Sequence, residues 1–540
     1  MKFPKRTKYM LFGSFIFLAF SLRYPYTPHE IGWDSYFIHG LVNTLNHHGN
    51  FSWWVHPLSP FGLTPFSYGS AVPVTLSAFS QLSGLSIESS IWLFGIICGI
   101  LGIFGSYMAA KELFNNDNYI FLTVFGFTTS QVFLGYTTWT LTTRGFFITV
   151  LPFFIFLLLK NAKAKKFNIY TFVIILIFIF LVAIHHFYSF LVLPIISYLI
   201  IKRVYLSKKF AKLKKQKQLK KIINIICVIF LFLIILLILF DILNSTTLTG
   251  NVGEIYDSKF DWFFNIIIIY ARQLGILGLF GIFGFFYLLF KPKISLNETL
   301  LIFFVLCLLL FIVITIYMPP FIAIFCYLLA GFGLYFIGTY FYKKKNKKFA
   351  IIILILILSI SLTFSYFYRA RYPDIDAETE HDEIYMEEDN YDAGLWLKLS
   401  TDDSIIYSNN VYPLKRIAGV MYLKQFPGSP IEQLENKYVS MEDFEVNLIS
   451  PLDPDFWSES YYEAEPNIES INWKANRLKK ENYDSNFSID LILKYNIKYV
   501  IEDHPVFLDE KDKDKIFFTS LSDKCFKIYS NQDYSVWYIH

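Results

Sequence analysis

The stretch His29–Gly49, HEIGWDSYFIHGLVNTLNHHG, follows the first hydrophobic segment of a 540-residue chain. We expect residues 33–48 to form a helix, which turns by about 100° per residue. One face of this helix is then apolar and the other polar, as is typical of a helix that lies along a membrane surface. The apolar face holds Trp33, Phe37, Ile38, Leu41, Val42 and Leu45, and the polar face holds Ser35, Tyr36, His39, Asn43, Asn46 and His47.

Asp34 falls near the middle of the apolar face of this expected helix. A carboxylate is costly in apolar surroundings unless it has a partner. Asp34 therefore either meets a partner inside a helix bundle, which would suit a functional group, or lies before a helix that begins later. In the structural alternative, Asp34 is a helix N-cap and Trp33 is only an anchor at the membrane interface.

The composition predicts a membrane protein with many spans. Hydrophobic residues make up 54% of the chain and aromatic residues 20%, and the mean hydropathy is +0.43. Soluble proteins have a lower apolar content. The net charge of +4 does not indicate nucleic-acid binding, because the lysine runs fit cytoplasmic loops. The five cysteines form neither a disulfide framework nor a CxxC metal motif.

About eleven segments are long and apolar enough to be transmembrane helices. Basic residues recur in alternate loops, which places the N-terminus in the cytoplasm and the C-terminus outside the cell. We expect the first span to remain uncleaved. The spans are predicted at 8–22, 90–110, 118–136, 145–160, 168–184, 187–201, 222–242, 264–290, 296–316, 320–342 and 349–367.

The predicted fold class is a polytopic α-helical membrane protein with an extracytoplasmic α/β domain. Residues 1–368 form the transmembrane domain, with a first external loop at 23–89, and residues 369–540 form the α/β domain. In this domain, apolar patterns predict helices and strands in turn. The helices are expected at 392–399 and 491–496, and the strands at 404–408, 497–501, 526–529 and 534–539.

On this topology, the rare charged and imidazole groups gather at the outer surface, where such residues are functional candidates. Some also have a structural interpretation: the His185-His186 pair as interfacial residues without a ligand, Arg144 as a residue that extends to the interface, and Arg272 as a partner of Asp261. The candidates are Glu30, Asp34 and His39 in the first external loop, Arg144 before the fourth span, His185 and His186 after the fifth, and Arg272 in the eighth.

Together, a carboxylate, two arginines and histidines match a lipid-linked phosphate substrate. Arginine binds phosphate through its fixed fork of donors, and a carboxylate can deprotonate or orient an attacking hydroxyl. Because no pool of nucleotide sugars exists outside the cell, a polyprenyl-phosphate-linked sugar is a suitable donor there.

At these positions the chain resembles the GT-C superfamily of membrane glycosyltransferases, which includes oligosaccharyltransferase catalytic subunits, protein O-mannosyltransferases and lipid A aminoarabinose transferases. The resemblance is carried by GWDSYFIH at 32–39, TTRG at 142–145, His185-His186, and DAGLWL at 392–397. Two features of oligosaccharyltransferases are missing: a WWDYG-type motif after residue 370, and an acidic residue in the second external loop, TTWTLTTR. Both absences argue against sequon glycosylation and weaken the case for a divalent metal, which stays open.

The resemblance implies a glycosyltransferase of the plasma membrane that moves a sugar from a polyprenyl-phosphate donor to an acceptor at the outer face. Asp34 is its candidate base, and Glu30, His39, Arg144, His185, His186 and Arg272 are its candidate substrate-binding residues. Two alternatives stand beside it: a transporter or flippase of lipid-linked saccharides, and a non-catalytic scaffold of GT-C-like fold. Membrane lipid is an expected partner and nucleic acid is not; the sugar, the acceptor and the oligomeric state are left open.

Overall fold

The computed structural model describes most of the membrane part of the chain and segments of the C-terminal part. The span predicted at 222–242 lies outside the described residues except for residue 225, and the helix predicted at 491–496 lies largely outside them. The described residues are 2–48, 69–207, 225, 259–310, 318–343, 347–370, 386–400, 405–408, 416–417, 419–421, 424–426, 489–490, 492–493, 497–503, 525–531 and 534–539.

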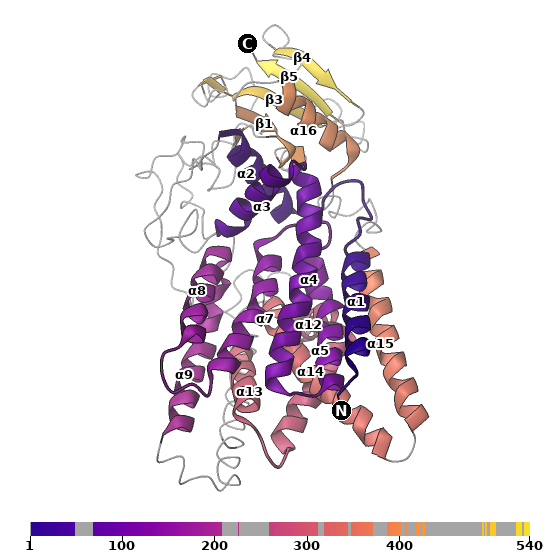
Figure 1. The fold of residues 1–540 in the computed structure, drawn as a ribbon. Coiled ribbons are helices and arrows are strands. Elements are labelled where there is room, and N and C mark those ends of the chain that lie inside the picture. The colour runs from indigo at the N-terminus through magenta and orange to yellow at the C-terminus, as the bar shows by residue number, and fades with distance from the viewer. Residues whose placement is uncertain are drawn as a thin grey trace.

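The membrane part is a bundle of long helices that run between two ends of the molecule (Figure 1). Among the described residues, six helices are long and apolar enough to cross a membrane. The chain is therefore a polytopic helical membrane protein, and the count of eleven spans stays a prediction. The bundle comprises α1 (Lys5–Leu22), α4 (Ile87–Leu113), α5 (Asp117–Thr128), α6 (Gln131–Gly135), α7 (Thr143–Asn161), α8 (Ile169–Ile184), α9 (Val192–Leu206), α12 (Lys259–Phe290), α13 (Leu296–Leu309), α14 (Pro319–Lys343) and α15 (Lys347–Ala370), with the 3₁₀ helix η1 (His186–Leu191) before α9.

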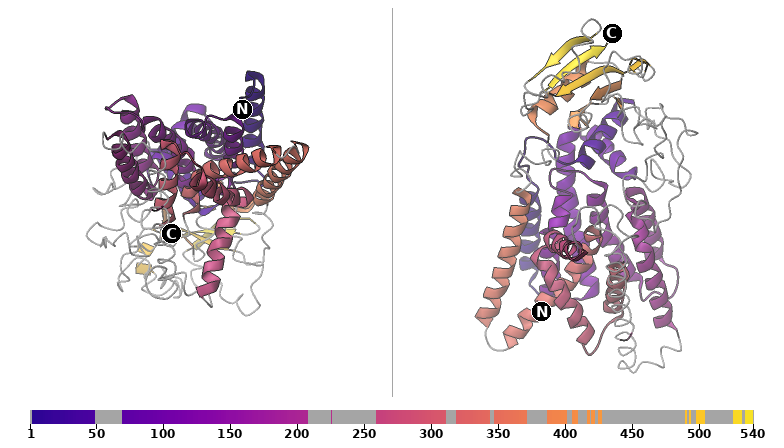
Figure 2. Two further views of the ribbon diagram at one scale, coloured as in Figure 1. Left: turned by 90° about the horizontal axis from the view of Figure 1, so that it is seen from below. Right: turned by 180° about the vertical axis from the view of Figure 1, so that it is seen from behind.

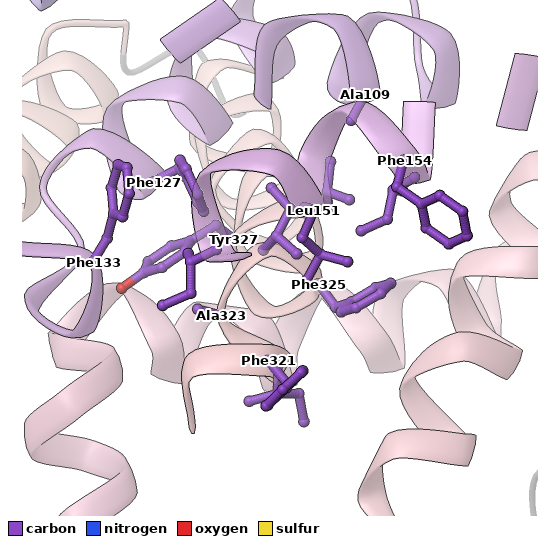
Figure 3. Close-up of a cluster of buried hydrophobic side chains, with 14 of the residues drawn as sticks. Ala109, Phe127, Phe133, Leu151, Phe154, Phe321, Ala323, Phe325 and Tyr327 are labelled. Atoms are coloured by element: carbon purple, nitrogen blue, oxygen red, sulfur yellow. The ribbon is translucent and has the colours of Figure 1, made fainter. Parts of the chain in front are cut away.

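Helix α14 lies at the centre of the bundle core, and aromatic side chains from α5, α6 and α7 surround it (Figure 3). Phe127 and Phe133 lie with ring centroids 4.8 Å apart. The hydroxyl of Tyr327 donates a hydrogen bond of 2.7 Å to the carbonyl of Leu274, so this buried polar group is satisfied. Since lipid is as apolar as these side chains, close packing rather than exclusion from water holds such a core together.

Two predicted spans are interrupted in the structure. The predicted span 118–136 is split into α5 and α6, because the side chain of Ser130 accepts a bond from the amide of Phe133 and starts a new helix there. Helix α12 bends at Gly275, whose φ of 65° is in the left-handed region that favours glycine. The half of α12 before the bend projects out of the bundle (Figure 2).

Among the described residues of the C-terminal part, helix α16 packs on a mixed sheet of the order β2-β1-β3-β5-β4. Strand β1 pairs in parallel with β2 and β3, and β5 is antiparallel to β3 and β4. Ala393 and Leu397 of the helix pack on the sheet. How far residues 369–540 form one domain stays a prediction. The elements are α16 (Glu388–Ser400), β1 (Ile405–Ser408), β2 (Lys424–Phe426), β3 (Ile497–Asp503), β4 (Cys525–Ser530) and β5 (Tyr534–Ile539).

Helices α2 (Trp33–His48) and α3 (Ala71–Ser83) lie between the end of the bundle and this sheet (Figure 1). The apolar side of α2 packs into the bundle core through Ile38 and Val42. Its other side is covered by the C-terminal part. There the amide of Asn43 donates to the carbonyls of Gly419 and Val420 at 2.9 and 3.0 Å.

The polar side of α2 is thus covered by protein, and its position along a membrane surface stays a prediction. Asn43 also accepts a bond of 2.6 Å from the ammonium group of Lys398, and Tyr36 packs against Met386. A polar face can be buried at an internal interface when each of its groups finds a partner. Of the six predicted polar-face residues, Ser35, Tyr36, His39 and Asn43 are buried, and only His47 is exposed.

Candidate active site

Asp34 lies in the first turn of α2, which begins at Trp33. The residue before the helix is Gly32, with a φ of 95°, and its carbonyl accepts from the amides of Ser35 and Tyr36 at 2.9 and 3.1 Å. A residue with a Cβ would be strained at this φ. The helix therefore begins before Asp34, and the alternative of Asp34 as the N-cap is wrong.

The loop before α7 packs directly against this turn. The amide of Ile31 donates to the carbonyl of Trp139 at 2.9 Å, and the amide of Leu141 donates to the hydroxyl of Ser35 at 3.0 Å. Thr142 then caps α7, because its hydroxyl accepts from the amide of Gly145 at 2.9 Å. These bonds fix the first turn of α7 beside the first turn of α2.

Arg144 is in that first turn of α7, and its guanidinium faces the carboxylate of Asp34 at 3.9 Å. The two side chains are 24% and 17% exposed, so both are partly accessible. The guanidinium also lies 5.8 Å from the ring centroid of Tyr136. A separation of 3.9 Å is longer than a hydrogen bond. The two groups are therefore close enough for both to contact the same bound molecule.

Glu30 and His39, expected as substrate-binding residues, are buried and bonded to each other. The carboxylate of Glu30 accepts from Nδ1 of His39 and from the hydroxyl of Ser35. Its backbone carbonyl accepts from the hydroxyl of Tyr36 at 3.2 Å. These contacts are internal to the segment that carries Asp34. Whether Glu30 and His39 also bind substrate stays a prediction.

The two predicted histidines and Arg272 are placed differently from the Asp34–Arg144 pair. His185 is buried and caps η1, with Nδ1 accepting from the amide of Phe187 at 3.1 Å, and its ring lies 6.5 Å from that of Phe147 on α7. His186 begins η1, and its side chain lies outside the described part. Arg272 has an exposed side chain on α12, three residues before the bend. Their roles in phosphate binding stay predictions.

Several residues that shape this end of the molecule were not expected from the sequence. His29 contacts Glu88 of α4 and Glu388 of α16 through its two ring nitrogens, at 2.9 and 3.2 Å. Arg23 is fully buried and donates to the hydroxyl of Thr137 at 3.0 Å. In the sequence, Arg23 directly follows the first predicted span and His29 lies in the loop after it, a pattern that equally predicts solvated residues.

No family model matches the chain. No curated protein sequence matches it either. Among solved structures, the apo oligosaccharyltransferase of Archaeoglobus fulgidus matches with a TM-score of 0.58 and 12% identity, over 92% of this chain and 70% of that chain. The same organism's oligosaccharyltransferase AglB, in complex with an inhibitory peptide and a dolichol-phosphate, gives 0.55 and 12% over 93% and 70%.

A third match covers both chains almost completely. ArnT from Cupriavidus metallidurans, bound to undecaprenyl phosphate, has a TM-score of 0.52 and 11% identity, over 99% of this chain and 98% of that chain. At such identities a likeness shows the fold and leaves the chemistry to be argued from the residues. The resemblance predicted from the sequence is confirmed at that level: the chain has a GT-C-like fold.

Proposed function

We propose that this protein is a glycosyltransferase that takes a sugar from a polyprenyl-phosphate-linked donor. The observation that carries the proposal is the partly exposed Asp34–Arg144 pair, 3.9 Å apart at the end of a GT-C-like bundle. Two of the similar structures hold a dolichol-phosphate and an undecaprenyl phosphate, which supports the same class of lipid here. A lipid tail suits a site at the end of a membrane bundle, because the tail can stay among the helices while its phosphate reaches the polar end.

The reaction is a displacement at the anomeric carbon of the donor sugar. An acceptor hydroxyl attacks this carbon, and the bond to the phosphate oxygen breaks with its electron pair going to the phosphate. Asp34 takes the proton of the hydroxyl, or orients that hydroxyl for attack. Arg144 stabilises the charge that grows on the leaving phosphate, helped by the positive N-terminal end of α7. When Asp34 becomes protonated, the guanidinium is released from it and interacts more strongly with the phosphate.

The placement of the lysines supports the proposed orientation. Figure 1 shows the N-terminus and the sheet at opposite ends of the bundle. Lys8 pairs with Asp117 at 2.9 Å, Lys160 with Glu112 at 3.2 Å, and Lys291 bonds Glu298. In the proposal this basic end is cytoplasmic, and Asp34, Arg144 and the C-terminal part lie outside the plasma membrane.

A metal ion is not part of the proposed steps. An oligosaccharyltransferase structure of Archaeoglobus fulgidus holds Zn and sulfate, so the fold accommodates metal in that protein. In the part of this chain that the structure describes, no group of three or more His, Cys, Asp or Glu side chains is arranged to hold one. Asp34 faces the guanidinium of Arg144 at 3.9 Å. The described residues alone therefore form no cluster of metal ligands, and a divalent metal stays open.

Purified protein in lipid nanodiscs, given undecaprenyl- and dolichyl-phosphate donors with labelled hexoses or pentoses, tests the function. Membranes from the producing cells serve as the source of acceptor. We expect protein-dependent release of polyprenyl phosphate from one donor and transfer of its label to a product. In sealed vesicles, label that crosses the bilayer on an intact donor would overturn the proposal in favour of a transporter. Neither cleavage nor crossing, over the whole donor panel, would overturn it in favour of a scaffold.

A further inference from the structure

His29 joins three segments that are far apart in the sequence. Its Nδ1 lies 2.9 Å from a carboxylate oxygen of Glu88, at the start of α4, and its Nε2 lies 3.2 Å from a carboxylate oxygen of Glu388, at the start of α16. The imidazole also stacks on the ring of Tyr391, with centroids 4.0 Å apart and an angle of 12°. One buried side chain thus connects the bundle, the first external loop and the C-terminal part.

This arrangement favours a proton on both ring nitrogens of His29. An ionised carboxylate only accepts hydrogen bonds, so a neutral imidazole could satisfy one of the two glutamates but not both. Burial opposes the charged form, but the bonds and charges of Glu88 and Glu388 outweigh it and raise the pKa of His29 above its usual value. The imidazolium is therefore the form that fits the site.

Hydrogen bonds connect the surroundings of His29 to the segment that carries Asp34. The carboxylate of Glu88 that bonds His29 also accepts from the backbone amide of Glu30 at 3.3 Å. Glu30 in turn accepts from Ser35, and the hydroxyl of Ser35 accepts from the amide of Leu141 in the loop before Arg144. A continuous set of hydrogen bonds runs from α16 to the two segments that carry the Asp34–Arg144 pair.

We propose that His29 is a positioning residue whose imidazolium links α16 to α4 and holds Asp34 against Arg144. The C-terminal part is then needed for catalysis because it completes this link, together with the bonds of Asn43 to Gly419, Val420 and Lys398. The kinetic consequence rests on the proposed function. The docking of α16 is independent of the proposed function, because the position of α16 can be measured without any turnover.

The link through His29 should weaken as pH rises. Since the pKa of His29 is raised in the folded protein, its contribution is complete below its usual pKa of 6.5 and is lost as pH rises through the higher folded value. The groups that face His29 are Glu88 from α4, and Glu388 and Tyr391 from α16, with Glu30 next to it in the chain. Burial and the charges of Glu88, Glu30, Asp392 and Glu388 raise the pKa of Tyr391 to about 12, so Tyr391 stays neutral through this range.

Spin labels measure the docking directly. We place them at Leu82 of α3 and Leu399 of α16, which are 89% and 77% exposed, in a protein whose five native cysteines are replaced. At about pH 6 the distance distribution between the labels should be narrow, and it should broaden as pH rises above the folded pKa of His29. The variant His29→Gln should give the broad distribution at every pH. Equally narrow distributions for both proteins at both pH values would overturn the proposal.

Two further variants keep the test decisive if His29→Gln folds poorly. Glu388 is 68% exposed, so Glu388→Gln should fold, and it should move the broadening to lower pH because one negative charge beside the imidazolium is lost. Asp392→Asn removes an exposed carboxylate from the same helix and should leave the broadening where it is. An unmoved transition in Glu388→Gln would contradict the link.

Donor cleavage gives the second readout. At about pH 6, His29→Gln should lower kcat by roughly 2- to 30-fold with little change in KM for the donor, because the residue acts through the position of Asp34. In the wild-type protein, kcat should fall as pH rises above the folded pKa of His29. This fall should be absent from His29→Gln. An unchanged kcat together with a broadened distance distribution would overturn the coupling to catalysis. Absence of turnover in the wild-type protein would count against the proposed function and leave the docking result to decide the link.

Discussion

Asp34→Asn should lower the rate of donor cleavage by roughly 10²- to 10⁴-fold, the usual contribution of a positioned general base. The amide keeps the shape of the carboxylate but cannot take the proton of the acceptor hydroxyl. Because Asp34 is partly exposed at the start of α2, the substitution should leave the fold and the donor KM nearly unchanged. The measurement is the initial rate of polyprenyl-phosphate release from labelled donor.

The chain offers a matched control for this variant. Glu112 forms a carboxylate–cation pair with Lys160 at 3.2 Å, at the other end of the same helix that carries Arg144. Glu112→Gln removes a carboxylate of the same kind from the basic end of the bundle and should leave the rate unchanged. Full activity in Asp34→Asn would refute the assignment of Asp34.

Arg144→Met should lower kcat by roughly 10²- to 10³-fold, as expected when one fixed donor to a developing charge is removed. The donor phosphodiester carries one negative charge, and the phosphate gains a second as the sugar leaves. The interaction with Arg144 therefore strengthens in the transition state, and kcat should fall more than the KM for the donor rises. Arg144→Lys should recover part of the loss, since an ammonium keeps the charge but not the two-pronged geometry.

The control for Arg144 is Lys160→Met, which removes the cation at the far end of α7. It should retain the wild-type kcat. An Arg144→Met variant with unchanged kcat and a raised KM would mean that Arg144 binds the donor equally in the ground and transition states, and would remove it from catalysis.

Much of the geometry around Asp34 could be expected from the sequence. The 3.6-residue period predicted the helix over 33–48, and the structure has α2 at Trp33–His48. The alternation of basic loops put the loop at 137–144 at the same end as the loop at 23–89. The structure brings Arg144 to 3.9 Å from Asp34. These features depend on local periodicity and on the count of spans, which a sequence carries directly.

The burial of the polar side of α2 could not be expected in the same way. It depends on Gly419 and Val420, more than 370 residues further along the chain, whose carbonyls satisfy Asn43. His29 was likewise only one of several polar residues in a loop until Glu88 and Glu388 were placed against it. Periodicity says which side of a helix is polar, but it does not say whether water or protein covers that side.

The bend in α12 could not be predicted from the sequence either. Gly275, Gly278, Gly281 and Gly284 recur every third residue, which favours a face for close helix packing. Gly284 lies in such a close contact, because a Cβ there would be 1.8 Å from the carbonyl oxygen of Leu329 on α14. Gly275 instead permits a left-handed backbone and the bend, and the same residue type thus serves two purposes within three turns.

The most direct test of the account is a double-mutant cycle on donor cleavage, with Asp34→Asn, Arg144→Met and the double variant. Residues that act on one reacting molecule as a unit show strongly non-additive losses. We predict that the double variant cleaves donor at a rate close to that of the slower single variant. Losses that multiply would contradict the claim that Asp34 and Arg144 form one catalytic site.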